Sequence, residues 1–139
     1  YYDVQADFMG GKREIPCMAK NRGFFNTSYA TGKTDNGAYW SFDTTLHLIG
    51  KQKLPNLNSN PLEYRLPEFS KSYATLNGQI ARNFNKNIRA YLGGENLTGY
   101  TQDHPILDVQ NPFGNYFDAG MVYAPIMGAN VYLGLDFKF

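Results

Sequence analysis

Apolar and polar side chains alternate strictly through the stretch Trp40-Ser41-Phe42-Asp43-Thr44-Thr45-Leu46-His47-Leu48. Successive side chains of a β-strand point to opposite faces, so this period of two predicts a strand with one apolar and one polar face. The same period recurs at the C-terminal end, in Val131-Tyr132-Leu133-Gly134-Leu135-Asp136-Phe137-Lys138-Phe139. Both stretches are therefore expected to be strands of a sheet that is apolar on one side only.

Four further segments show shorter runs of the same alternation: residues 3–8, 25–29, 74–80 and 88–95. No segment sustains the 3.6-residue period of an amphipathic helix. The chain is thus predicted to be all-β, with six antiparallel strands.

The connections between these segments alternate between short and long. Residues 32–37 and 85–87 are short connections rich in the Asn, Asp and Gly that tight turns require. Residues 9–22, 51–71 and about 98–120 are long connections. In an outer-membrane β-barrel the periplasmic turns are short and the extracellular loops are long, which produces this same alternation.

Composition excludes several classes of protein. A net charge of +1 leaves no electrostatic footprint for nucleic acid. No apolar run approaches the roughly 20 residues of a membrane-spanning helix, so a helical membrane protein is excluded. The single cysteine, Cys17, allows no internal disulfide. Aromatic residues make up 16% of the chain, which suits both barrel strands and a secreted β-sandwich, so composition leaves these two alternatives open.

Six strands are too few for a complete membrane barrel, because about eight are needed to close a cylinder around packed side chains. An open edge in lipid leaves backbone amides and carbonyls without partners, at a cost of several kcal/mol each. The chain also begins at Tyr1 without an initiator methionine or a signal peptide. We therefore expect it to be one piece of a longer polypeptide that supplies more strands.

The stretch Tyr91-Leu92-Gly93-Gly94-Glu95-Asn96-Leu97-Thr98 resembles the penultimate strand of TonB-dependent receptors, in which an Asn-Leu pair ends the strand. The chain end is similar to the signal by which the barrel-assembly machinery recognises outer-membrane barrels, and the residues that match it are Tyr132, Gly134, Phe137 and Phe139. Residues 111–119 and 123–126 are similar to receptors of this type from Bacteroidetes-like bacteria. The resemblance spans nearly the whole chain and is strongest from about Phe42 onward.

This resemblance implies more than the alternation does. Residues 1–139 would be the last six strands of a barrel of about 22 strands, in the bacterial outer membrane, with its loops facing outside. The plug domain and the segment that engages the TonB complex would lie outside this chain. The function implied is active import of a nutrient such as a siderophore, cobalamin, haem or a metal complex.

The resemblance also implies the partners: the remaining strands and plug of the same receptor, TonB, the barrel-assembly machinery, and membrane lipid with lipopolysaccharide. A surface lipoprotein is a further possible partner. The ending departs from that of the larger glycan importers that pair with a lipoprotein lid, which favours the other substrate classes.

Ligand recognition is expected in the loops, because loops on a rigid scaffold commonly carry it. The candidates combine rings or charge with hydrogen-bonding groups: Tyr64, Arg65, Tyr100, His104, Phe113 and Tyr116. His47, on the polar face of its strand, is a candidate for contact with substrate or plug. A solvated position for the two histidines and loop packing for the rings are the competing interpretations, and both are more common.

No catalytic role, metal site or cofactor is predicted. The chain has no zinc-protease, phosphate-loop or nucleophile-elbow motif. Cys17, Met18, Met9 and His104 include soft copper ligands, but their spacing fits no ligand pattern. Two alternatives to import stay open. One is a surface barrel that acts as an adhesin or structural protein, and the other is a soluble carbohydrate-binding β-sandwich. The sandwich predicts that Trp40, Phe42, Leu46 and Leu48 are buried in a protein core.

Overall fold

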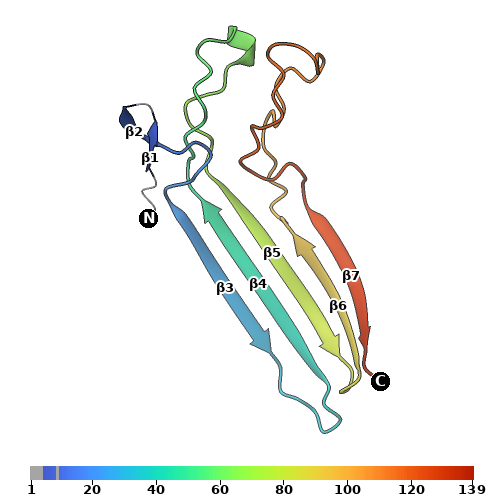
Figure 1. The fold of residues 1–139 in the computed structure, drawn as a ribbon. Coiled ribbons are helices and arrows are strands. Elements are labelled where there is room, and N and C mark those ends of the chain that lie inside the picture. Colours follow the sequence, from blue (N-terminus) through green and yellow to red (C-terminus); the bar gives the residue numbers. More distant parts are fainter. Residues whose placement is uncertain (1–4, 9) are drawn as a thin grey trace. The chain divides into compact units, whose positions relative to one another are not determined.

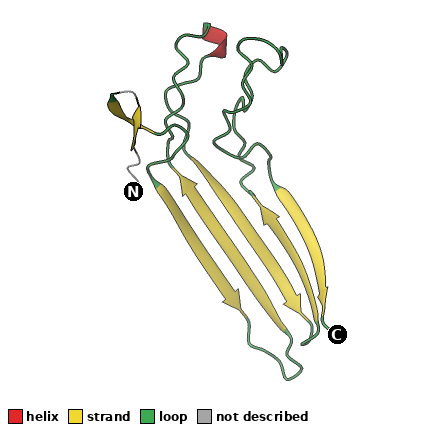
Figure 2. Cartoon of the chain, viewed as in Figure 1, coloured by secondary structure: helices red, strands yellow, loops and turns green. Residues whose placement is uncertain are grey.

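The computed structural model describes residues 5–8 and 10–139, and within these ranges the chain is all-β, without an α-helix (Figure 1, Figure 2). Five strands form one antiparallel sheet in the order β3-β4-β5-β6-β7. They are β3 (Arg22–Ala30), β4 (Tyr39–Ile49), β5 (Tyr73–Asn83), β6 (Ile88–Glu95) and β7 (Asn130–Phe137). Each strand pairs with the next one along the chain, so the sheet is a simple meander.

The chain divides into two compact units. The sheet unit comprises residues 24–47, 74–100 and 127–139, and the loop unit comprises residues 1–23, 48–73 and 101–126. The long connections 50–72 and 96–129 join the strands at one end of the sheet. The short connections 31–38 and 84–87 join them at the other end. The predicted alternation of short turns and long loops is therefore confirmed for these four connections.

Cross-strand pairing fixes which residues share a face of the sheet. Ile80 pairs with Leu92, and Leu92 pairs with Leu133, so these three side chains lie on one face. We call this the apolar face. On β6 and β7 it carries Ile88, Ala90, Leu92, Val131, Leu133, Leu135 and Phe137. The alternation predicted for these strands is thus confirmed.

The apolar face continues on β3 and β4 through contacts between aromatic rings. The ring centroid of Phe42 lies 6.2 Å from that of Tyr29 and 6.4 Å from that of Trp40. These side chains are exposed, as are Leu92 and the apolar side chains of β7. Leu133 retains 77% of its accessible surface. The sheet therefore presents a broad apolar surface that the described part of the chain leaves uncovered.

The opposite face, here called the polar face, is joined by side-chain hydrogen bonds. Asn26 Nδ2 donates to Thr45 Oγ1 at 2.7 Å, and Ser28 Oγ donates to Asp43 Oδ1 at 2.6 Å. Across β6 and β7, Arg89 Nη1 donates to Asp136 Oδ2 at 3.1 Å. Several charged and polar groups of this face are thus paired with groups on the neighbouring strand, although the buried Asn83 Nδ2 has no hydrogen-bond partner among the described residues.

Two tyrosine rings on the polar face lie over glycines of the neighbouring strand. Tyr91 pairs with Gly134 and Tyr132 pairs with Gly93, and each ring covers the glycine opposite it. A Cβ atom on either glycine would overlap the ring. The two rings contact each other edge to face, with centroids 6.3 Å apart. The bare glycine backbone is what lets these rings lie flat on β6 and β7.

The end of β6 is fixed by Asn96, which adopts the left-handed conformation with φ of 48°. Its Nδ2 group donates to the carbonyls of Tyr100 and Met127, at 2.8 and 3.0 Å. Leu97, the next residue, lies over Gly94, and a Cβ on Gly94 would come 2.5 Å from Leu97 Cδ2. The Asn-Leu pair therefore ends the strand, as its position in the sequence predicts.

Two buried glutamines organise the loop unit. Gln102 Nε2 donates to the Met121 carbonyl at 2.6 Å, and its Oε1 accepts from the amides of Tyr123 and Ala124. Gln52 Nε2 donates to the Tyr123 carbonyl at 3.1 Å. The apolar core around them is small and consists of Ala19, Leu54, Leu107, Met121 and Ala124. Amide hydrogen bonds, more than apolar burial, thus hold the long loops in shape.

The prediction of six strands in one sheet is wrong at its first strand. Residues 5–8 form β1 (Gln5–Phe8), which pairs with β2 (Gly11–Glu14) as a separate two-stranded hairpin. β2 lies in the stretch predicted to be a long loop, because Gly11-Lys12-Arg13-Glu14 lacks an alternation of apolar and polar residues. Asp3 and Val4, also assigned to that first strand, lie outside the described residues.

Candidate ligand-binding site

Tyr64 and Tyr116 come from different long connections, yet their rings stack with centroids 5.0 Å apart and an interplanar angle of 15°. Tyr64 ends the short 3-10 helix η1 (Leu62–Tyr64), which begins after Pro61. Tyr116 belongs to a tight loop closed by the backbone bridge between Leu107 and Asp118. Two residues 52 positions apart in the chain thus meet in one aromatic pair.

Asp108 holds the loop that carries Tyr116. It has φ of 48°, and its Oδ1 accepts a hydrogen bond from Asn111 Nδ2 at 2.9 Å. The Gly114 amide donates to the Asn111 carbonyl at 2.8 Å. A Cβ on Gly114 would come 3.0 Å from Asp108 Oδ2, so a larger residue would crowd the carboxylate. The loop therefore has a defined conformation in which Phe113 projects from the tip.

The surroundings of Tyr64, including Asp108, shift the ionisation of its phenol. Desolvation in the loop, followed by the negative charges of Asp108 and Glu63 and a hydrogen bond with Asp108, raises the pKa of the Tyr64 phenol. The phenol consequently stays protonated throughout the physiological range and remains a hydrogen-bond donor.

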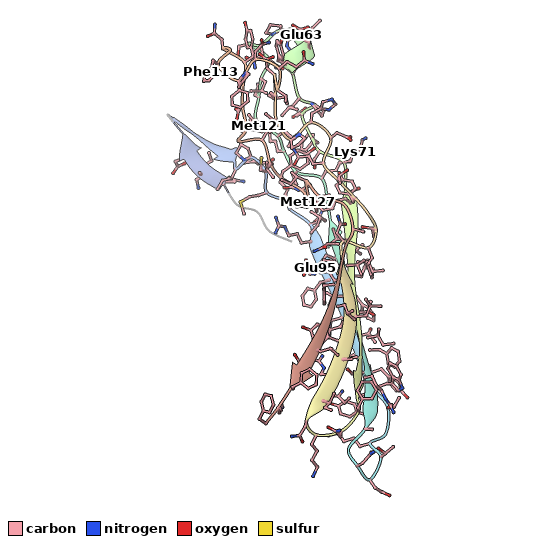
Figure 3. The ribbon with its side chains drawn as sticks, turned by 90° about the vertical axis from the view of Figure 1, so that its right-hand side faces the viewer. Glu63, Lys71, Glu95, Phe113, Met121 and Met127 are labelled. Atoms are coloured by element: carbon pink, nitrogen blue, oxygen red, sulfur yellow. The ribbon has the colours of Figure 1, made fainter. Side chains whose placement is uncertain are left out.

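An open hollow of about 640 Å³ lies beside the stacked pair. Its wall contains three aromatic rings, two prolines, three amide side chains and two carboxylates, contributed by Pro61, Glu63, Tyr64, Asp108, Gln110, Asn111, Pro112, Phe113, Gly114, Asn115 and Tyr116. Figure 3 labels Glu63 and Phe113 at the tips of the two loops that form it. Among the described residues no Lys, Arg or His lines the hollow, so the charge of its lining is negative.

Three predicted ligand-binding residues, Tyr64, Phe113 and Tyr116, are brought together in this hollow. Arg65 is adjacent in sequence, but its Nε donates to the Asn60 carbonyl at 2.7 Å, which anchors the loop. His104 is exposed in the loop unit and does not line the hollow. The structure thus groups half of the loop candidates into one site.

The other two predicted residues, Tyr100 and His47, belong to the sheet unit. The Tyr100 carbonyl accepts from Asn96 at the end of β6. His47 lies on β4, in the same alternation as Asp43 and Thr45.

Sequence reasoning missed the five polar residues of the hollow: Glu63, Asp108, Gln110, Asn111 and Asn115. The turn signal Asn111-Pro112-Phe113-Gly114 marked a loop, but a turn signal does not show which side chains converge. Only the spatial approach of the two long connections reveals that Glu63 and Asp108 flank one pair of rings.

The residues predicted to form the C-terminal assembly signal fall into two groups. Tyr132 and Gly134 take part in the tyrosine–glycine contacts on the polar face. Phe137 pairs with Ile88 on the apolar face, and Phe139 follows the last strand with its ring exposed.

The described residues contain no group of three or more His, Cys, Asp or Glu side chains that could hold a metal ion. Of the residues weighed as copper ligands, Met9 lies outside the described ranges. Burial raises the pKa of the Cys17 thiol, which disfavours the thiolate that a metal would need.

Within the described ranges, no helix is long and apolar enough to cross a membrane. Comparisons with protein-family models, with curated proteins and with solved structures found no match for this chain. The case for a function therefore depends on the residues and geometry of the chain itself.

Proposed function

We propose that this chain forms the C-terminal part of the wall of an outer-membrane β-barrel, in a TonB-dependent receptor that imports a nutrient. The observation that carries the proposal is the two-faced sheet, with an uncovered apolar face and a hydrogen-bonded polar face. Strands of a membrane barrel alternate lipid-facing apolar residues with polar residues that line the lumen, which accounts for both faces. In water, an exposed apolar surface of this breadth is an aggregation liability.

The edges of the sheet support the same proposal. β3 and β7 each have one neighbour in the five-stranded sheet, which leaves a row of backbone donors and acceptors on the far side of each strand. Long, flat edge strands of soluble proteins are commonly protected by charges, bulges or prolines, because they pair readily with other strands. β7 contains no Lys, Arg or Pro, so pairing with further barrel strands is the natural way to satisfy its edge.

The aromatic residues near the short turns also fit a membrane boundary. The Arg82 guanidinium lies 5.1 Å from the ring centroid of Trp40, and Lys33 Nζ lies 5.2 Å from that of Tyr39. Rings with an apolar body and a polar edge gather at the headgroup level of membranes, together with cations that extend toward water. Tyr39 and Trp40 follow the connection between β3 and β4, which the proposal places at the periplasmic boundary.

The import role rests on the resemblance to TonB-dependent receptors and on the ring-lined hollow in the long loops. The substrate classes implied are a siderophore, cobalamin, haem or a metal complex. A surface barrel that acts as an adhesin or structural protein shares the same wall and differs only in transport. The soluble sandwich is less consistent with the geometry, because Trp40, Phe42 and Leu48 are exposed instead of buried, while Leu46 is half-buried.

Fractionation of cells that produce the native protein tests the proposal. We expect the protein in the outer membrane, resistant to extraction by urea and released by detergent, with an intact mass that includes a plug-like domain. Uptake of the cognate nutrient should stop when the proton gradient is dissipated. A membrane-bound product without any gradient-dependent uptake would favour the adhesin. A 15.7 kDa product that is soluble without detergent would contradict the barrel.

A further inference from the structure

The hollow beside Tyr64 and Tyr116 has the size and lining of a ligand site. Its volume of about 640 Å³ lies within the range of pockets for small organic molecules, roughly 300–1,000 Å³. Phe113 is fully exposed, at 102% of its reference surface, although the loop that carries it is closed by backbone and side-chain hydrogen bonds. A fully exposed ring on a well-defined loop provides a contact surface without contributing to the core.

The charge of the lining selects the chemistry of the ligand. Glu63 and Asp108 are both present, and within the part of the chain that the structure describes neither of them belongs to an ion pair. Asp108 accepts hydrogen bonds from Asn111 and interacts with the Tyr64 hydroxyl, so its charge is fixed in the wall. Glu63 is exposed and carries the carboxylate that a ligand can approach. An anionic ligand would meet repulsion from both groups.

The rings favour the same class of ligand. The face of an aromatic ring attracts a cation within about 6 Å of its centroid, and two nearby carboxylates add to this attraction. Tyr116 is 37% exposed although it stacks on Tyr64, so part of its ring is open to a ligand. Gln110, Asn111 and Asn115 add amide donors and acceptors at the rim.

We infer that this hollow binds an organic cation with a flat apolar face, which stacks on Tyr116 and Phe113 and places its charge toward Glu63. A role of this ligand in uptake rests on the proposed function. Binding itself is independent of transport and can be measured on the purified protein. A failure to bind therefore leaves membrane integration untouched, and a soluble protein could still bind.

Calorimetric titration of the intact, detergent-purified protein at low ionic strength tests this inference with three small probes. Benzyltrimethylammonium is the cation, benzyl alcohol is the neutral analogue and benzenesulfonate is the anion. We expect saturable binding of the cation alone. Glu63→Gln should weaken it about two- to fivefold, as expected for an exposed charge pair. Tyr116→Ala should weaken it by about tenfold or more, since it removes the stacking ring.

Glu68→Gln is the matched control, because Glu68 is an exposed carboxylate of the same connection that does not line the hollow. This variant should bind the cation as the parent protein does. Absence of saturable binding, equal binding of benzyl alcohol, preference for benzenesulfonate, or unchanged affinity in Glu63→Gln and Tyr116→Ala would each overturn the inference.

Discussion

Gly134 and Gly93 occupy positions where any side chain would overlap a neighbouring ring. Each lies opposite a tyrosine whose ring occupies the space of a Cβ atom. Rings laid over a bare backbone bury their faces, and the hydroxyl can still reach a polar neighbour. Tyr132 shows this, because its hydroxyl donates to Gln79 Oε1 at 3.4 Å on the same face. These two contacts define how β6 and β7 pack together.

Replacing Gly134 by alanine should therefore displace the Tyr91 ring. We expect a loss of about 1–3 kcal/mol in the free energy of unfolding, the usual cost of inserting a methyl group into a packed site. Urea unfolding of the protein in lipid vesicles measures it. Gly128→Ala is the control, since a Cβ there meets nothing within 4 Å. Equal stability of the two variants would contradict the contact between Tyr91 and Gly134. So would a double variant in which Tyr91→Ala fails to relieve the effect of Gly134→Ala.

Asn96 combines a left-handed backbone with three side-chain hydrogen bonds, two donated by Nδ2 and one accepted by Oδ1 from Thr98 Oγ1. Asn96→Ala loses all three bonds and puts alanine in the left-handed conformation, so about 2–3 kcal/mol of stability should be lost. Asn96→Gly keeps the backbone conformation and loses only the hydrogen bonds, so its loss should be smaller. Thermal or urea unfolding ranks the three proteins. Equal stability of the alanine and glycine variants would show that the backbone conformation contributes nothing.

The raised pKa of Tyr64 makes the loop unit sensitive to alkaline pH. The folded loop holds the phenolic proton more tightly than the unfolded chain does. The resulting stabilisation is complete below the ordinary tyrosine pKa of about 10 and is lost as pH rises through the folded pKa. An ultraviolet titration should show one tyrosine ionising later than exposed ones, and Asp108→Asn should move it toward the ordinary value. An unchanged titration in Asp108→Asn would contradict the role of that carboxylate.

At the scale of elements, the sheet was largely predictable and the loop unit was not. Alternation alone located β3 to β7, because a strand with two different surroundings must show a period of two. The β1–β2 hairpin was missed at β2, where Gly11 and three charged residues give no alternation. Gln52 and Gln102 could not be recognised as buried, since their partners are backbone groups up to 71 residues away. The three rings of the hollow were predicted as ligand-binding residues, but its two carboxylates were not.

A charged substitution on the apolar face distinguishes whether this face contacts lipid or water. Leu133 is 77% exposed, so Leu133→Arg in an aqueous protein should change stability by no more than about 0.5 kcal/mol. Facing the middle of a bilayer, the same change should cost about 2–4 kcal/mol. Unfolding of the vesicle-embedded protein measures the difference. Thr75→Arg, on the polar face of β5, is the control and should be tolerated.

At the scale of the whole molecule, the separate observations agree on one arrangement. The connections alternate in length, the faces alternate in polarity, and the rings near the short turns are paired with cations. Within the loop unit, aromatic and acidic groups line one hollow. The barrel wall proposed above would require each of these features for a separate physical reason.

Spin-label accessibility in lipid bilayers tests this arrangement most directly. Cys17 is replaced by serine, and a nitroxide is attached at Leu133→Cys on the apolar face or at Gln79→Cys on the polar face. We predict that the label at 133 collides mainly with oxygen, which concentrates in lipid. The label at 79 should collide mainly with a water-soluble nickel chelate. A label at 133 that collides mainly with the nickel chelate, or with neither reagent, would contradict a lipid-facing sheet.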